Sequence, residues 1–525
     1  MKQIFHNGVF YSMNEAEETY DYMSVNNGKI EKMGKGSPTI PCDVQEIDLQ
    51  GRFVCPGFID THMHLLGYGA FLNECDLTGS TSIESFKERI ESFKEKTTAE
   101  WLAGGGWNHD FFIEKRLPNR YDLDAVCADR PVILYRACCH IAVVNSFVID
   151  RFNISVDEEI EGGSIDHVNG IPTGILRENA IDLVSCHMPA NSELKIRKYF
   201  SDAQAELFKV GITSVQTDDL PYVNPEEYQM LIDIMGTLED YPLRISEQIQ
   251  YTTPETIKKF TALGYKTGWG NNHFRIGPLK ILADGSLGAR TAKLTKPYAD
   301  DLETDGILIY TPEMLDRLIE EGINQKMDLA VHAIGDKTNE LIQHSIVKHE
   351  KRKDARHAII HSQIMSDELI DKMATTNISA LVQPVFLEYD MSIAEARVGK
   401  DLAETSYAYK TMLEKGIKLG FGSDCPVEAP NPFRSIHYAV TRKRPDGTVF
   451  YPNEAIDIHK ALKAFTSDAA YFSREEALKG QLKEGYLADF IVLNRDPLKS
   501  EFPDLLTIIV DETYIDGNCV YKRDL

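Results

Sequence analysis

The chain has 525 residues, of which 43% are hydrophobic and 26% are charged, as is typical of a globular protein with a substantial core. Its 81 acidic and 56 basic side chains give a net charge of −25, which repels the phosphates of nucleic acids and anionic membranes. These values exclude a disordered, collagenous or coiled-coil protein. The sequence has no apolar run of membrane-spanning length and no apolar secretory segment near its start. We expect a cytoplasmic protein that acts on a small molecule and binds neither nucleic acid nor membrane.

Short apolar segments alternate with amphipathic helical segments through the middle of the chain. Apolar strands separated by helices predict a parallel sheet covered on both faces. Eight such units predict a (β/α)8 TIM barrel, an α/β fold. The predicted strands are Phe53–Asp60, Gly211–Thr217, Arg244–Gln250, Arg275–Ala283, Met327–Ala333, His357–Ser362, Asn377–Gln383 and Ile417–Gly422. The predicted helices include Ser192–Val210, Pro312–Gln325, Asp336–Lys348, Ser366–Thr375 and Leu402–Lys415.

Two regions lie outside this alternation. Residues 1–52 and 480–525 read as short strands joined by turns, and they predict a composite β-sandwich domain built from both termini. Residues 53–479 would then form the barrel domain. Within it, residues 65–195 make a large insertion after the first barrel strand. Because the loops at that face of a barrel carry function, we expect this insertion to act as a cap over the active site.

Histidines at the end of the first barrel strand point to a metal site. His62 and His64 are two residues apart, so their side chains project to the same side of a strand. Other potential ligands stand at the ends of later strands: Lys280, His332, His361 and Asp424. Barrel enzymes place their functional groups at these strand ends. A lysine inside an apolar strand is costly unless it is paired or modified. Its reaction with CO2 would give a carbamate, which can bridge two divalent ions, and the whole set suits two zinc-like ions.

Several motifs carry a resemblance to a known family. The segments 56–64 (PGFIDTHMH) and 485–493 (GYLADFIVL) are similar to the openings and closings of amidohydrolase superfamily members, including the cytosine-deaminase-like and imidazolonepropionase-like branches. Three further segments resemble amidohydrolase family 3, the YtcJ-like and N-substituted formamide deformylase-like group. They are 105–108 (GGWN), 170–178 (GIPTGILRE) and 280–292 (KILADGSLGARTA). The resemblance covers essentially the whole chain.

The resemblance implies a role for each predicted ligand. His62 and His64 would bind the more buried ion, a carboxylated Lys280 would bridge, and His332 and His361 would bind the more exposed ion. Asp424 would touch the first ion and act as the catalytic residue, taking a proton from a metal-bridging hydroxide and passing it to the leaving amine. The expected reaction is hydrolysis of a non-peptide C–N bond, amide or formamide-like, in a small molecule. The implied cofactors are two divalent ions, zinc first, and the implied assembly is a homodimer.

Four further residues are candidates for substrate contact. Asp284 and Arg290 follow the strand of Lys280 in the loop over the mouth, and each could instead order that loop. His140 and Trp107 belong to the insertion, where packing is the alternative role. Family members tend to carry Asp-Gly-His at the position where this chain has Cys138-Cys139-His140, so the polarity of its pocket differs from theirs.

Other functions remain open at this point. A mononuclear deaminase of an amino-heterocycle would leave Lys280 unmodified and need one ion. A phosphotriesterase-like lactonase shares the ligand order, but the terminal β-strands and the long insertion argue against it. From a different class, the chain could be a non-catalytic binding protein on the same fold, although that function predicts lost ligands and every ligand position here is filled. Metal content would discriminate among these functions.

Overall fold

Eight parallel strands form the central sheet of the computed structural model, which describes residues 2–156, 160–189, 191–220, 228–236, 242–499 and 502–524. The sheet order is β19-β18-β17-β16-β15-β14-β13-β6, and every neighbouring pair is parallel. The predicted eight-stranded parallel barrel is therefore confirmed. Its strands are β6 (Phe58–Met63), β13 (Ile212–Thr217), β14 (Arg244–Gln250), β15 (Phe274–Leu282), β16 (Leu329–Ala333), β17 (Ala358–His361), β18 (Ser379–Val382) and β19 (Leu419–Phe421).

The first and last barrel strands meet at the predicted metal ligands. Asp424 N donates to His62 O at 2.9 Å, and His64 N donates to Cys425 O at 2.8 Å, both just beyond the end of β19. Gly422 allows this approach, because a Cβ there would lie 2.8 Å from the backbone N and O of His62. The seam between β6 and β19 is therefore held by the same short segments that carry the ligands.

The first predicted barrel strand is wrong in its extent. Phe53–Asp60 splits into β5 (Phe53–Pro56), which pairs with β20 and β1, and β6, which pairs with β13. The chain changes sheets at Gly57, whose N donates to Asp489 O at 3.0 Å. Pro56 and Gly57 lie inside the predicted segment, but both halves are buried, so the sequence pattern does not show which sheet each half joins.

Strands from both ends of the chain form one sheet with the order β22-β21-β20-β5-β1-β2-β3. A composite β-sandwich was expected, and the strands of both termini pair in one continuous ladder, because β5 bonds to strands from both ends of the chain. A tight turn joins β21 to β22, and Phe502–Thr507 forms a 3-10 turn before β21. The bounds are β1 (Lys2–Tyr11), β2 (Thr19–Asn26), β3 (Lys29–Gly34), β4 (Gln45–Asp48), which pairs with β1, β20 (Phe490–Leu493), β21 (Val510–Ile515) and β22 (Asn518–Lys522).

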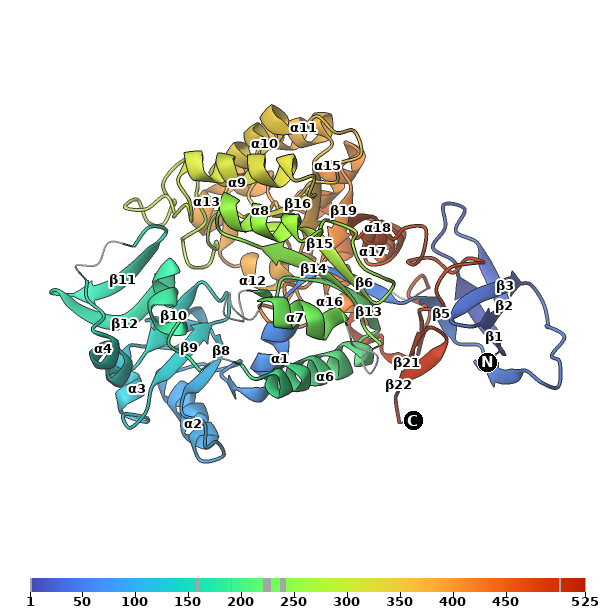
Figure 1. The fold of residues 1–525 in the computed structure, drawn as a ribbon, viewed down its shortest axis with the longest axis horizontal. Coiled ribbons are helices and arrows are strands. Elements are labelled where there is room, and N and C mark those ends of the chain that lie inside the picture. Colours follow the sequence, from blue (N-terminus) through green and yellow to red (C-terminus); the bar gives the residue numbers. More distant parts are fainter. Residues whose placement is uncertain are drawn as a thin grey trace.

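The insertion after β6 carries its own six-stranded sheet, with the order β11-β12-β10-β9-β8-β7. Figure 1 shows this sheet and the terminal sheet on opposite sides of the barrel. Its elements are α1 (Leu65–Asn73), β7 (Cys75–Asp76), α2 (Ile83–Lys94), β8 (Leu102–Trp107), α3 (Arg120–Asp124), β9 (Val132–Arg136), β10 (Ile141–Val144), α4 (Ser146–Phe152), β11 (Gly163–Val168), β12 (Ile171–Glu178) and α5 (Asp182–Ser185). The long helix α6 (Glu193–Lys209) then leads back to β13.

Most of the predicted helices form close to their expected bounds. The helix α9 (Pro312–Asn324) begins as its sequence predicts, with Thr311 accepting a hydrogen bond from Met314 N and proline in the first turn. Helices α10 (Asp336–His349) and α11 (Asp367–Thr376) follow between later strands. The helix predicted at Leu402–Lys415 is wrong, because it breaks into α14 (Lys400–Glu404) and α15 (Tyr409–Glu414). Tyr407 lies between them with a φ of 52°, a left-handed conformation that interrupts a helix.

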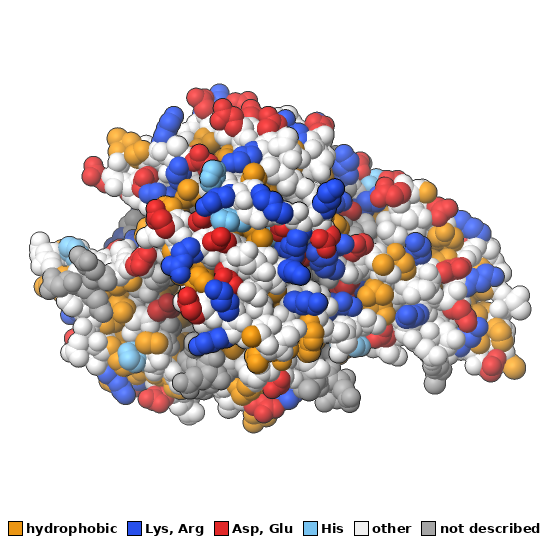
Figure 2. All heavy atoms as spheres, turned by 45° about the horizontal axis from the view of Figure 1, so that its top comes forward, with side chains coloured by type: hydrophobic (Ala, Val, Ile, Leu, Met, Phe, Trp, Pro, Cys, Tyr) orange, Lys and Arg blue, Asp and Glu red, His pale blue; other side chains and the backbone are white. Residues whose placement is uncertain are grey.

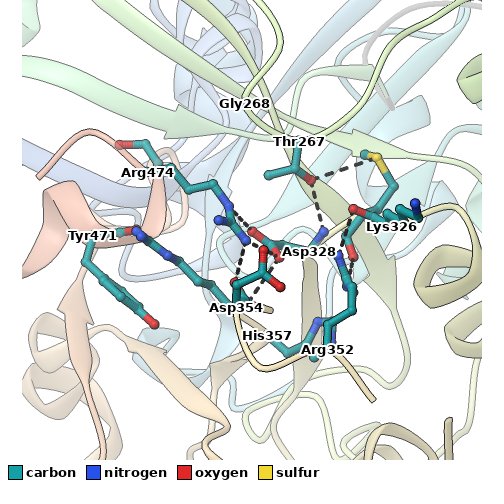
Figure 3. Close-up of polar contacts among 12 residues, drawn as sticks. Thr267, Gly268, Lys326, Asp328, Arg352, Asp354, His357, Tyr471 and Arg474 are labelled. Atoms are coloured by element: carbon teal, nitrogen blue, oxygen red, sulfur yellow. Dashed lines mark hydrogen bonds and ion pairs between the residues drawn. The ribbon is translucent and has the colours of Figure 1, made fainter. Parts of the chain in front are cut away.

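A dense polar network supports the N-terminal end of the barrel (Figure 3). Asp328, just before β16, accepts two hydrogen bonds from Arg474, at 2.7 and 2.9 Å. Arg474 also donates to Asp354 O, and Arg352 donates to the carbonyls of Lys326 and Met327. This network ties the loops before β16 and β17 to the segment after α18 (Ser467–Phe472).

The outer surface is mixed in charge. Figure 2 shows acidic and basic side chains interspersed across one face of the molecule. Among the residues that the structure describes, no helix combines the length and apolarity needed to cross a membrane.

Candidate metal centre

Three predicted ligands converge where β6 meets the segment after β19. Asp424 Oδ1 lies 3.2 Å from His62 Nε2 and 3.3 Å from His64 Nε2. Two ligands bound to zinc at about 2.05 Å in a tetrahedral arrangement are about 3.3 Å apart. The described residues thus bring together one group of three side chains with the separations of a metal site. The donor set of two imidazoles and one carboxylate suits a divalent ion such as zinc.

Hydrogen bonds at Nδ1 set the tautomers of the His62 and His64 rings. His62 Nδ1 donates to Gln248 Oε1 at 2.8 Å, and Gln248 Nε2 in turn donates to Thr61 O. His64 Nδ1 donates to Asp218 O at 2.8 Å. With Nδ1 acting as donor, the Nε2 of each ring keeps its lone pair. Both lone pairs then face Asp424, as binding of an ion requires.

A second pair of histidines lies beside the first. His361 Nε2 is 3.0 Å from His332 Nδ1, and the rings of His361 and His62 have centroids 5.9 Å apart. His361 Nδ1 lies 2.7 Å from Gln383 Oε1, and His332 Nε2 lies 3.1 Å from Gly285 O. If each ring donates to its carbonyl partner, the facing nitrogens carry only lone pairs and cannot bond to each other. A cation between them would satisfy both.

Lys280 lies beside His62 and is only 2% exposed. Its Nζ is 3.5 Å from His62 Nε2 and 3.2 Å from Asp218 Oδ2. Asp218, at the end of β13, is itself buried, and its other carboxylate oxygen has no hydrogen-bond partner among the described residues. Lys280 therefore lies beside a predicted ligand, with a carboxylate close enough to pair with an unmodified ammonium group.

The electrostatics of the cluster favour ligand forms. Burial lowers the pKa of His332 and His361 well below their usual range, so both rings are neutral at pH 7. Burial alone would raise the pKa of Asp424, but the adjacent imidazole rings of His62 and His64 outweigh it and hold that pKa well below its usual range. His361 and Asp424 also adopt left-handed backbone conformations, with φ values of 73° and 59°. Such strain in residues other than glycine is common at functional sites.

Comparison with known proteins identifies the family. A model of the amidohydrolase family matches residues 45–521. The chain belongs to the amidohydrolase family. This amidohydrolase is 33% identical to YtcJ of Bacillus subtilis, whose name places it among the amidohydrolases, over the full length of both chains. It is 24% identical to the N-substituted formamide deformylase of Arthrobacter pascens, over 92% of this chain and 90% of the deformylase. An uncharacterised metal-dependent hydrolase of Pyrococcus horikoshii has a similar structure, with a TM-score of 0.77, 26% identity, and coverage of 96% of this chain and 99% of the other.

The four residues considered for substrate contact lie in different places in this amidohydrolase. His140 reaches the site, because its ring centroid is 5.5 Å from that of His332. Trp107 is fully buried in the core of the insertion, where its indole N–H donates to Leu134 O. Asp284 is also fully buried, and it accepts hydrogen bonds from three backbone N–H groups and the Thr338 hydroxyl, which orders the loops around it. Arg290 pairs with Asp300 at 2.9 Å.

Several residues of the amidohydrolase site were missed in the sequence. Asp218, Gln248 and Gln383 stand at the ends of the second, third and seventh barrel strands, where they contact the predicted ligands. Asp60 accepts hydrogen bonds from Ser423 Oγ at 2.6 Å and from His62 N at 3.1 Å, which fastens β6 to the segment that carries Asp424. The first three lie at or near the carboxyl ends of predicted strands, and that position was the available signal.

Proposed function

We propose that this amidohydrolase hydrolyses a non-peptide C–N bond, of the amide or formamide type, in a small molecule. The observation that carries the proposal is the convergence of six ligand-type side chains from five barrel strands at one end of the barrel. His62, His64 and Asp424 would hold one divalent ion and His332 and His361 a second, with a carboxylated Lys280 between them. Zinc is the ion that we expect first. When bound, the ions would lower the pKa of a water molecule and polarise the carbonyl group of the substrate.

Asp424 is the group that we expect to move the proton. Its Oδ1 lies among the ligand nitrogens, and its ionised form can accept a proton from the attacking water. The water oxygen bonds to the carbonyl carbon, the C–N bond breaks, and Asp424 returns the proton to the leaving nitrogen. Gln248 and Gln383 hold the rings of His62 and His361 in the orientation that this chemistry needs.

One observation favours a second candidate function. The contact of 3.2 Å between Lys280 and Asp218 is that of an unmodified lysine in a buried ion pair. Addition of CO2 to the amine would remove the cation that faces Asp218. An unmodified Lys280 fits a mononuclear site made by His62, His64 and Asp424, such as a deaminase of an amino-heterocycle would use.

Metal analysis and a substrate panel would test both candidates. Protein purified without chelators would be measured for zinc, iron, manganese and cobalt, and 13C NMR after growth with labelled bicarbonate would detect a carbamate. The panel would contain N-substituted formamides, acyl amines, cyclic amides and amino-heterocycles. Two ions per chain, a carbamate signal that is absent in Lys280→Met, and turnover of an amide support the proposal. One ion and deamination support the second candidate. A lack of metal uptake together with a lack of turnover would overturn both.

A further inference from the structure

One histidine of the insertion lies beside the candidate metal centre. His140 lies in the loop between β9 and β10, and its ring packs against that of His332 with centroids 5.5 Å apart at an angle of 50°. The barrel ligands all come from strand ends, so this residue is a contribution of the insertion. If the proposed function holds, a substrate bound beside His332 and His361 would also meet His140.

Glu178 contacts His140 at two points. Its Oε2 lies 2.6 Å from His140 Nδ1, and its backbone N donates to His140 O at 3.1 Å. The Glu178 side chain is only 1% exposed, so this ion pair is screened little by water. With Nδ1 held by Glu178, Nε2 is the ring nitrogen of His140 that is left to contact a substrate.

The backbone of Glu178 is strained. Its φ of 48° and ψ of −129° lie in a region that glycine adopts readily and other residues avoid, at a cost of about 1–3 kcal/mol. Its second carboxylate oxygen, Oε1, is buried without a hydrogen-bond partner among the described residues. Both features are unfavourable for folding, and a glycine would remove both. Glutamate at this position therefore costs folding free energy, and such a cost is expected where a residue is needed for function.

The ion pair of Glu178 and His140 also lies against the barrel. Glu178 Oε1 lies beside Gly285, where an added Cβ would be 2.4 Å from it. Gly285 O in turn lies 3.1 Å from His332 Nε2. Glu178 thus contacts both the loop that orients His332 and the histidine that packs against His332.

We propose that His140 is a catalytic residue that contacts the substrate through Nε2, and that Glu178 is the residue that positions it. This proposal rests on the proposed function. It identifies the acyl side of the substrate as the part that His140 meets, because His140 packs against His332, a ligand of the ion expected to polarise the carbonyl group. The insertion then supplies part of the chemistry as well as covering the site.

Chemical rescue would test the contact of His140 with the substrate. We expect His140→Ala to lower kcat/KM about 100-fold on the amide that the wild type turns over best, measured per folded molecule with unchanged metal content. Added imidazole should restore part of this activity in His140→Ala, and it should not do so in Asp424→Asn. An unchanged kcat/KM in His140→Ala would overturn the proposal alone. Absence of turnover by the wild type on every amide would overturn the proposed function, and this proposal with it.

A matched pair of variants would test Glu178. We expect Glu178→Gln to lower kcat/KM about 10-fold at unchanged metal content, and to remove a low-field Nδ1–H proton signal that is also absent in His140→Ala. The control is Glu350→Gln, because Glu350 makes a similar contact of 2.7 Å with His357 at the opposite end of the barrel. That control should lose stability while it keeps kcat/KM. If Glu178→Gln also loses only stability, Glu178 has a structural role and the positioning proposal is wrong.

Discussion

The two ends of the barrel hold buried polar clusters that are bonded in opposite ways. At the N-terminal end, the carboxylate of Asp328 accepts hydrogen bonds from Arg474 and from Arg356 N, and Glu350 accepts from His357 and Arg352. At the C-terminal end, Asp218 Oδ1, Glu247 Oε2 and Glu178 Oε1 are buried without partners among the described residues. His332 and His361 also lie there with two ring nitrogens 3.0 Å apart.

This difference assigns the polar cluster at the N-terminal end of the barrel to stability and the cluster at the C-terminal end to function. A fully paired buried network rigidifies the fold, whereas unpaired buried groups cost free energy and are retained where a ligand or a reaction uses them. In barrel enzymes the same division holds between the two faces, since the C-terminal face is catalytic and the N-terminal face is structural. Substitutions at the two ends should therefore change different measurements.

The largest expected effect is on catalysis at the C-terminal end. Asp424→Asn should lower kcat at least about 1,000-fold at saturating zinc, because the amide cannot accept the proton from water. Steady-state kinetics on the amide that the wild type turns over best would measure this loss. Asp328→Asn should keep the wild-type kcat per folded, metal-loaded molecule. A similar kcat loss in both variants would show that the two ends are not separate.

The next effect is on stability at the N-terminal end. Asp328→Asn should lower the free energy of unfolding by about 3 kcal/mol, because it leaves Arg474 without its buried carboxylate partner. Urea unfolding followed by circular dichroism would measure the change. The control is Asp371→Asn, which removes an exposed pair with Lys415 and should cost about 0.5 kcal/mol or less. Equal losses of unfolding free energy in the two variants would show that the polar network at the N-terminal end of the barrel contributes no more than an exposed ion pair.

Metal binding should raise the free energy of unfolding only when the predicted ligands at the C-terminal end of the barrel are intact. Zinc at 100 times its dissociation constant should add about 2.7 kcal/mol to the free energy of unfolding. The double variant His62→Asn, His64→Asn should lose most of this gain, while Asp328→Asn should show the full gain from a lower starting point. Thermal shifts at several zinc concentrations would measure it. A full gain in the double variant would place the ion elsewhere.

The smallest expected effect is on the pH dependence of stability, through Glu350 at the N-terminal end of the barrel. Burial alone would raise the pKa of Glu350, but hydrogen bonds from His357 and Arg352 hold it well below its usual range. A carboxylate with a lowered folded-state pKa stabilises the fold above its unfolded pKa of about 4.3 and loses that contribution as the pH falls further. Discounted for partial exposure, the loss between pH 5 and pH 3 should be about 1 kcal/mol. Glu350→Gln should show a loss smaller by that amount in urea titrations at both pH values.

The sequence alone determined the barrel and the family, and it predicted the order of the ligand-type residues. Alternating strand and helix patterns are local signals, so seven of the barrel strands lie close to their predicted positions, and His62, His64, His332, His361 and Asp424 were identifiable from their places at strand ends. The segments 105–108, 170–178 and 280–292 carried a resemblance that the family match confirms.

Only the tertiary structure decided how distant side chains pair. The contacts of Lys280 with Asp218 and of Glu178 with His140 join residues far apart in the chain, and the hydrogen bonds of Gln248 and Gln383 depend on neighbouring strands. The same holds for the change of sheets at Gly57 and for the burial of Trp107, since an apolar segment has one pattern whichever core it enters. Periodicity reports which face of a strand or helix is buried, and it carries no information about the partner on the other side.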